Sequence, residues 1–355
     1  MHASAPSVAS LREIDPASLP AATRDVLDGV DRVLLHHLPM TVRFRRVTSR
    51  DGLLLHGPAG WGEAAPFWDY APQESSTWLL AALEGALVPA PPVRRDAVPV
   101  NVTVPVCTPE EADRRVRASG GCATAKVKVA DPGTSVAEDV ERVAAVRAAL
   151  HDTVGDRARI RVDANGAWSP EEAVSAIRVL DRAAGGLEYV EQPCADVEGL
   201  TRVRRLVDVP VAADESIRRA EDPLAVARAG AADVAVVKVA PLGGIHRALE
   251  VADATGMDVV ISSALESSVG LSAGVRAAAA LPALDHACGL ATAQLLAADV
   301  TASPLLPRHG AIGVREVSPE ESLVGAHPLP EGLEERWRQR LDAMCRALAG
   351  RGAHA

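Results

Sequence analysis

Short apolar runs alternate with Ala-rich stretches of helical periodicity from about residue 98 to residue 290. The short runs are rich in β-branched residues and end in polar ones, which favours strands, while the longer stretches favour helices. Strands that alternate with helices are joined by crossovers and therefore run parallel. We predict strands at 98–104, 125–130, 159–163, 187–191, 209–214, 233–239, 258–262 and 286–290, and helices at 136–149, 170–183, 220–229 and 244–255.

Eight parallel strands joined by helices predict an α/β fold, a modified TIM-type (β/α) barrel over residues 99–309. A doubly wound open sheet is the alternative. It is disfavoured because no G-x-G-x-x-G follows the first strand.

The segments on either side of the barrel have other patterns. Residues 32–98 predict an α+β capping domain with antiparallel strands around a turn at 50–52; the strands are expected at 33–35, 41–47 and 53–56, and a helix at 74–87. Residues 310–355 end in a helix at 331–349, and we expect this segment to return to the cap. Residues 1–31 are predicted to be an extension with weak order at its start. The apolar stripe of the last helix is Leu333, Trp337, Leu341, Met344 and Leu348.

Charge and composition exclude several classes of function. The net charge of −10 and the lack of a basic patch argue against a nucleic-acid partner. We find no apolar run of about 18 residues that would predict a transmembrane helix, and no signal-peptide pattern at the start. The five cysteines lack metal-type spacing and fit reduced thiols in the cytoplasm. The sequence does not indicate an oligomeric state.

Lysine is scarce in this chain, which has 3 lysines against 34 arginines. All of them lie in two apolar β-like runs, Lys126 and Lys128 in one and Lys238 in the other. Arg stays protonated at any biological pH, whereas the surroundings of a Lys can tune its amine to give and take a proton. A charged residue inside such a run usually has a pairing or catalytic role. We therefore predict that the lysines carry the chemistry.

Strands two to six each place a charged residue near the carboxyl end. Alternate residues of a barrel strand face the interior, and active sites of parallel α/β barrels lie at the carboxyl ends of the strands. One βα unit separates each charge from the next, so we expect these side chains to meet in one site. They are Lys126 and Lys128; Asp163, which shares one strand face with Arg161 and Asn165; Glu191; Asp214; and Lys238.

Asp163, Glu191 and Asp214 are carboxylates from adjacent predicted strands. Carboxylate oxygens suit a hard cation, so we predict an Mg²⁺ site, with interior ion pairs to the lysines as the alternative. A metal that holds a carboxylate substrate favours removal of the α-proton, because the enediolate meets positive charge already in place. A Lys can act as the base, since nearby cations favour its neutral form.

These motifs resemble the enolase superfamily, and within it the muconate-lactonizing-like subgroup, over most of the chain. Segments 61–67, 261–270 and 289–293 are most similar to the o-succinylbenzoate synthase family. That resemblance implies a capped barrel and syn-elimination of water from 2-succinyl-6-hydroxy-2,4-cyclohexadiene-1-carboxylate, a step of menaquinone biosynthesis. The motifs are Lys-Val-Lys at 126–128, Asp163 in Val-Asp-Ala-Asn, Glu191 in Glu-Gln-Pro, Asp214 in Asp-Glu-Ser and Lys238 in Val-Lys-Val.

The resemblance also implies roles for single residues. Lys128 would remove the α-proton and return it to the departing hydroxide. Lys238 would hold the planar anion from the opposite side by charge and cation–π attraction. Lys126 and Arg161 would help to neutralise the substrate carboxylate. Ser262, Ser263 and backbone amides near Gly289 would receive the succinyl tail, and Asn165 is a further predicted substrate contact.

Other activities remain as alternatives. An N-succinylamino-acid racemase would use the same two lysines, and the sequence separates it poorly from a dehydratase. A mandelate-racemase-like enzyme needs a His base, but the nearby candidate, His286, begins a predicted strand, which favours a structural role. A dipeptide epimerase usually has an Asp-x-Asp near the eighth strand, which is missing here.

A serine hydrolase is the alternative from a different class. Gly270-Leu-Ser272-Ala-Gly274 matches G-x-S-x-G, and Asp285, Asp299 and His309 follow it in the right order. The nucleophile should sit at a sharp turn directly after a strand. Ser272 instead lies several residues beyond the seventh predicted strand, so this alternative is disfavoured.

Overall fold

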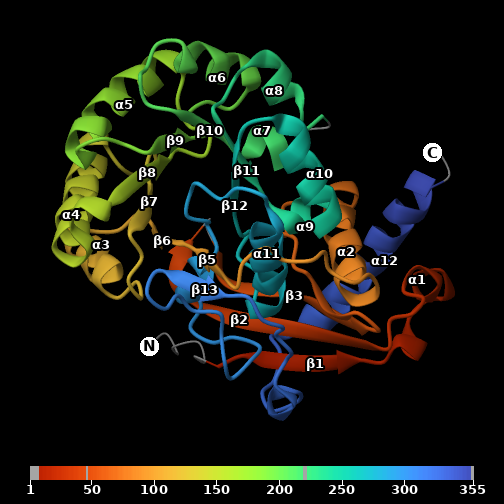
Figure 1. Cartoon of the computed structure of the whole chain (residues 1–355). Helices are drawn as coiled ribbons and strands as arrows, with labels where there is room; N and C mark the ends of the chain where they lie inside the picture. The colour runs from red at the N-terminus through yellow and green to blue at the C-terminus, as the bar shows by residue number, and fades with distance from the viewer. Residues whose placement is uncertain (1–7, 45–46, 219–221, 353–355) are drawn as a thin grey trace.

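A curled parallel sheet with helices outside it forms the larger part of the molecule, and an antiparallel sheet lies to one side of it (Figure 1). The structure is a computed structural model that describes residues 8–44, 47–218 and 222–352. Within those residues the parallel sheet has seven strands, which pair in chain order. They are β6 (Asn101–Val104), β7 (Thr124–Lys128), β8 (Arg159–Asp163), β9 (Tyr189–Glu191), β10 (Val211–Ala213), β11 (Val234–Val237) and β12 (Asp258–Ile261).

Helices follow the barrel strands and begin where the local sequence caps them. Ser135 and Ser169 cap α4 and α5 in reciprocal capping boxes with Glu138 and Glu172, which satisfies backbone donors that have no partner inside the helix. The helices are α3 (Pro109–Arg117), α4 (Val136–Val154), α5 (Pro170–Ala184), α6 (Val197–Arg204), α7 (Glu215–Arg218), α8 (Ala225–Ala229), α9 (Val239–Leu242), α10 (Ile245–Thr255) and α11 (Ser268–Ala280), with 3-10 turns η2 (Gly155–Arg157) and η3 (Ala291–Leu295).

The eighth predicted strand, at 286–290, is wrong as a regular strand. Cys288 makes a single parallel bridge to Val100, and Gly289 makes one to Ser262. The backbone approach there is close, since a Cβ on Gly289 would lie 2.5 Å from Ser262 Oγ. η3 begins soon afterwards, which leaves little extended chain for a ladder. This irregular segment closes the gap between β12 and the first barrel strand, so the predicted barrel class is confirmed.

The cap is built from both ends of the chain. β1 pairs with β2 along its length, and α1 lies against α12, where Thr23 Oγ1 donates to Asp342 Oδ1 at 2.8 Å. Residues from Ser10 onward therefore belong to the cap, which corrects the predicted extension over 1–31; residues 1–7 lie outside the described residues. The elements are β1 (Ser10–Ile14), η1 (Pro16–Ser18), α1 (Ala21–Val26), β2 (Arg32–Phe44), β3 (Val47–Gly57), β4 (Gly60–Ala64), α2 (Pro72–Leu87), η4 (Glu321–Leu323) and α12 (Leu333–Gly352), while β5 (Ala97–Pro99) pairs with β13 (Ala311–Gly313).

The turn predicted at 50–52 is also wrong, because these residues lie inside β3 and pair with β2. Asp51 is there to accept hydrogen bonds from the indole N–H groups of Trp68 at 2.9 Å and Trp337 at 2.7 Å. Gly52 is there for close packing, since a Cβ would lie 2.6 Å from the nearest side-chain carbon. A polar residue and a glycine that usually indicate a turn serve packing here.

The C-terminal helix docks on the cap, as its apolar stripe predicts. Leu333, Trp337, Leu341 and Met344 are buried among leucines of the cap strands. The cap in turn lies against the loops that follow the barrel strands, where Arg50 Nε donates to the carbonyl of a loop residue at 3.1 Å. Over the described parts of the chain, each helix is too short or too polar to cross a membrane.

Candidate active site

One pocket at the carboxyl ends of the barrel strands contains every lysine of the chain. Lys126 and Lys128 reach it from β7, because alternate strand residues point to the same side, and Lys238 reaches it from the end of β11. Their exposures of only 4–9% mean that each charge needs a partner. The other lining residues are Phe44, Thr103, Asp163, Asp214, Ser262, Ser263, Ala264, Leu265, Gly289 and Thr292.

Lys126 is held between two carboxylates. Its Nζ lies 2.9 Å and 3.1 Å from the two oxygens of Glu191 and 3.2 Å from Asp163 Oδ2. Burial lowers the pKa of Lys126, but the charges of Glu191 and Asp163 outweigh burial and raise that pKa. Lys126 is therefore suited to supply a fixed positive charge.

Lys128 pairs with Asp163 and donates to Asn165 Oδ1 at 2.8 Å. Asn165 has a left-handed φ of +48°, and its backbone N–H donates to Asp163 Oδ1 at 3.0 Å, so the turn after β8 fixes both partners of Lys128. Burial alone would raise the pKa of Asp163, but Lys128 and Lys126 hold it well below its usual value. The ring of Phe44, from the cap, lies 5.6 Å from Lys128 Nζ.

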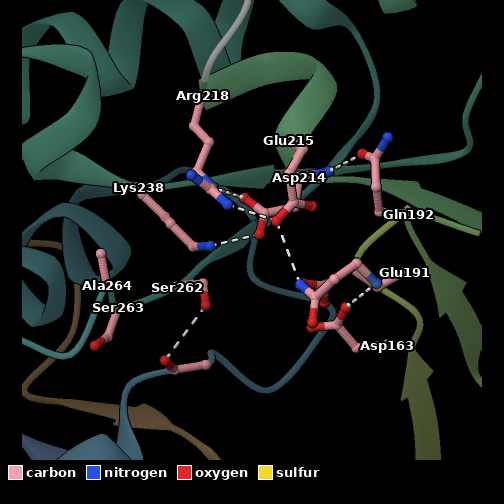
Figure 2. Close-up of polar contacts among 12 residues, drawn as sticks. Asp163, Glu191, Gln192, Asp214, Glu215, Arg218, Lys238, Ser262, Ser263 and Ala264 are labelled. Atoms are coloured by element: carbon pink, nitrogen blue, oxygen red, sulfur yellow. Dashed lines mark hydrogen bonds and ion pairs between the residues drawn. The ribbon is translucent and has the colours of Figure 1, made fainter. Parts of the chain in front are cut away.

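Asp214 is the centre of a second group of charges (Figure 2). Lys238 Nζ lies 2.5 Å from Asp214 Oδ2, and Arg218 Nε donates to Oδ1 at 3.0 Å. The backbone N–H of Asp214 donates to Gln192 Oε1 at 3.0 Å. Arg218 also donates to the hydroxyl of Tyr70 at 2.8 Å, which connects this group to the cap.

The three predicted metal ligands fit a hard divalent cation in their chemistry. Burial and the charges of Asp163 and Asp214 raise the pKa of Glu191 to about 7, although Lys126 opposes the rise. A divalent cation would offset that repulsion. Across the described residues, no set of three or more His, Cys, Asp or Glu side chains is already arranged to hold a metal. Lysine and arginine side chains compensate the carboxylates instead.

The predicted tail-binding residues form another wall of the pocket. Ser262 Oγ lies 3.5 Å from the carbonyl of Gly289, and the backbone N–H of Ser263 donates to the same carbonyl at 3.0 Å. The hydroxyl oxygens of Ser263 and Thr292 are hydrogen-bonded at 2.6 Å, and Ser263 Oγ also donates to Glu266 Oε2 at 2.8 Å. These contacts make the wall a fixed surface with polar groups at its edge.

Arg161 does not line this pocket, which corrects its predicted contact with the substrate carboxylate. Arg161 Nε donates to Glu188 Oε2 at 2.6 Å, and Nη1 donates to the carbonyl of Ala287 at 2.7 Å. Arg161 precedes Asp163 by two residues in β8, so its side chain points to the same face of the strand but lies one layer deeper in the barrel. His286 Nδ1 lies 2.8 Å from Glu188 Oε1 in the same partly buried cluster, and His286 is not among the residues that line the pocket.

The geometry does not support the serine-hydrolase alternative. Ser272 lies inside α11, and its hydroxyl donates to the carbonyl of Val269 at 2.7 Å. A Cβ on Gly274 would meet the Leu290 side chain at 2.7 Å, so this glycine serves helix packing. A nucleophile needs an exposed position at a strand-to-helix turn, which Ser272 does not have.

The sequence interpretation missed several residues at the site. Arg218 stands four residues after Asp214, the spacing at which helix neighbours meet, but a four-residue helix left no periodic signal. Gln192 comes from the loop after β9, and Thr292 comes from the short 3-10 turn η3. Phe44 and Tyr70 come from the cap, and no local pattern could assign them to a barrel pocket.

Two family models match the chain, one for each part of the fold. Residues 108–319 match the model described as Enolase C-terminal domain-like, and residues 35–86 match the one described as Enolase N-terminal domain-like.

Curated relatives match over almost the whole chain. The chain is 55% identical to the o-succinylbenzoate synthase of Thermobifida fusca (strain YX) over 86% of this chain and 93% of the relative. It is 48% identical to that of Mycobacterium ulcerans (strain Agy99) over 92% and 95%. Among solved structures, a muconate lactonizing enzyme from Pseudomonas fluorescens shares the fold, with a TM-score of 0.67, 22% identity, and coverage of 90% of this chain and 97% of that one.

Proposed function

We infer that this chain, which belongs to the enolase superfamily and within it to the o-succinylbenzoate synthase family, dehydrates 2-succinyl-6-hydroxy-2,4-cyclohexadiene-1-carboxylate to o-succinylbenzoate. The reaction is a step of menaquinone biosynthesis, and the chain is a carbon–oxygen lyase. One observation carries the assignment to this pocket: all the lysines of the chain meet carboxylates there. An enediolate needs both a base and positive charge around it.

The base in this proposal is Lys128. Its neutral amine removes the proton from the ring carbon next to the carboxylate. The electron pair of that C–H bond moves into the carboxylate to give the enediolate, and it returns to form the new ring double bond as the neighbouring C–O bond breaks on the same face. Lys128 then returns the proton to the departing hydroxide, and water leaves. Its contacts with Asp163 and Asn165 support this role, because they hold the amine in one place.

The other lysines supply charge. Lys238 follows β11, which three strands separate from β7 in the sheet, so it faces the substrate from the side opposite Lys128. There it stabilises the planar anion by charge and by cation–π attraction. Lys126, whose carboxylate partners keep it protonated, adds positive charge beneath the substrate carboxylate.

Enzymes of this superfamily use a divalent metal, and we propose that here it is Mg²⁺, held by Asp163, Glu191 and Asp214. When bound, the cation would hold carboxylate oxygens of the substrate and stabilise the charge of the enediolate. The repulsion between Glu191 and its neighbouring carboxylates supports this proposal.

The wall formed by Ser262, Ser263 and Gly289 is the proposed site for the succinyl tail, and Asn165 is proposed to lie at the substrate edge beside Lys128. We also propose that the cap and the barrel act as one unit over the substrate. A cytoplasmic location fits the cysteines, all of which are free thiols.

The arrangement of Lys128 and Lys238 also fits a second activity, racemisation of N-succinyl amino acids. Two amines on opposite sides of one carbon are what proton removal from one face and return to the other require. The test compares kcat/KM for the dehydration with kcat/KM for that racemisation, on the same preparation. We expect dehydration to be faster. A racemase value higher by orders of magnitude would make racemisation the main activity, while the proposed lysine and metal roles would stand.

A further inference from the structure

The cap places one carboxylate against the barrel that has no part in the chemistry above. Glu63, in β4, is fully buried, with 0% of its side chain exposed. It accepts hydrogen bonds from the backbone N–H of Ser267 at 3.0 Å and of Gly270 at 2.9 Å, and from the hydroxyl of Ser267. His36 Nε2 lies 3.3 Å away on the cap side. Hydrogen bonds to a buried carboxylate are strong, so Glu63 fixes the backbone at Ser267 and Gly270.

These contacts complete the beginning of α11. The first backbone N–H groups of a helix have no partners inside it. Ser267 Oγ accepts from the N–H of Val269 at 3.2 Å, and Asp299 accepts from the N–H of Ser268 at 3.1 Å. Glu63 takes the two remaining donors. A residue of the capping domain therefore satisfies backbone donors at the start of a barrel helix.

The segment between β12 and α11, residues 262–267, contributes Ser262 and Ser263 to the pocket wall described above. Glu266 folds back inside it and accepts from the backbone N–H of Ala264 at 2.8 Å. Leu265 has a left-handed φ of +66°, so the chain there is held in a conformation that side chains rarely adopt. Arg50 of the cap donates to the carbonyl of Leu265. The wall is thus tied to the cap in its middle by Arg50 and at its end by Glu63.

The glycine at position 270 fits the same contact. A Cβ on Gly270 would lie 2.6 Å from the Cβ of Glu266 and 2.8 Å from Glu63 Oε2. Only a glycine leaves room for both the Glu266 side chain and the Glu63 carboxylate. Trp61-Gly62-Glu63 in the cap and Ser267-Ser268-Val269-Gly270 in the barrel are therefore two halves of one contact.

We propose that Glu63 is a positioning residue for the dehydration: it fixes the segment 262–267, and through it the wall that receives the substrate tail. This inference rests on the proposed function, since the tail defines what the wall must bind. Lys128 and Lys238 stand on other strands, so moving the wall weakens substrate binding more than it slows the chemical step.

The test replaces Glu63 and a matched control. Glu63→Gln keeps the shape of the side chain but removes its charge. One carboxylate oxygen is replaced by an amide N–H₂, which cannot accept a hydrogen bond from the N–H groups of Ser267 or Gly270. Glu84→Gln is the control, because Glu84 makes the same kind of cap-to-barrel contact: it accepts from the backbone N–H of His246 at 3.2 Å and lies 2.9 Å from its ring, at the start of α10.

For Glu63→Gln we expect KM to rise at least about tenfold while kcat stays within about threefold, as loss of charged hydrogen bonds at a binding wall predicts. Hydrogen exchange at the backbone amides of 264–270 should become faster. Glu84→Gln should keep the parent KM. An unchanged KM in Glu63→Gln, or an equal rise in Glu84→Gln, would overturn the proposal.

A second variant covers the case in which Glu63→Gln does not fold. Ser267→Ala removes the hydroxyl that donates to Glu63 and that accepts from the Val269 N–H at the same helix start, so it should raise KM and speed exchange at the same amides; parent values for both would overturn the proposal. The two proposals fail separately. A parent chain without dehydratase activity refutes the function, whereas hydrogen exchange still reports whether Glu63 fixes the segment.

Discussion

Lys128→Arg is the substitution that separates charge from proton transfer at the proposed base. The parent ammonium pairs with Asp163 and lies 2.8 Å from Asn165 Oδ1. A guanidinium can donate to both of these oxygens, so the buried ion pair survives. A guanidinium does not give up its proton near neutral pH and cannot act as the base.

The expected loss follows from these contacts. The ion pair is kept, but the larger guanidinium must fit a packed site, so the free energy of unfolding should fall by about 1–3 kcal/mol, the usual cost of overpacking. Because proton transfer is lost, kcat/KM should fall roughly 10²–10⁴-fold, the usual contribution of a general base. That corresponds to about 3–5 kcal/mol of transition-state stabilisation.

The assay follows formation of the aromatic product by ultraviolet absorbance. Circular dichroism and Mg²⁺ titration establish first that the variant is folded and binds metal. Lys238→Arg is the matched control, because it keeps a cation facing the ring and should be less damaging. A folded Lys128→Arg chain within tenfold of the parent would refute the assignment of the base.

Three further predictions concern the metal, the cap and the response to pH. Glu191→Gln should weaken Mg²⁺ binding in calorimetry, and an unchanged affinity would remove Glu191 from the ligand set. Asp51→Ala should lower the free energy of unfolding in urea by about 1–3 kcal/mol, because the indole N–H groups of Trp68 and Trp337 both donate to Asp51 Oδ2 and lose that acceptor; a smaller change would contradict that role. The third prediction concerns Glu188. Burial alone would raise the pKa of Glu188, but hydrogen bonds from His286 and Arg161 lower that pKa from 4.5 to about 2. The stabilisation by Glu188 is therefore present above its unfolded pKa and lost as the pH falls toward 2, so Glu188→Gln should cost more stability at pH 6 than at pH 3, and equal losses would speak against it.

The barrel, and the meeting of several candidate residues in one pocket, could be predicted from the sequence because both follow from local rules. Alternation of strand and helix predicts a parallel sheet, and a polar residue at a strand end lies at the edge where barrel sites form. Lys126, Lys128, Asp163 and Lys238 lie in or beside one pocket for that reason. The position of Arg161 could not be predicted in the same way, since the two-residue period gives the face of a strand but not the depth in the barrel.

The contribution of the cap could not be predicted from local patterns. Glu63 and Ser267 stand 204 residues apart, and Arg50 and Leu265 stand 215 residues apart. No periodicity connects segments at that separation. The turn prediction at Asp51 was wrong for a related reason: its carboxylate accepts from Trp337 in α12, near the other end of the chain.

The most direct test of the central claim is the dehydration itself, measured with and without divalent cation. The purified chain is mixed with 2-succinyl-6-hydroxy-2,4-cyclohexadiene-1-carboxylate, and aromatisation is followed by ultraviolet absorbance in Mg²⁺, in excess chelator, and after Mg²⁺ is added back. We predict conversion to o-succinylbenzoate in Mg²⁺, its loss in chelator and its return with Mg²⁺. No conversion in Mg²⁺, or an undiminished rate in chelator, would contradict the claim.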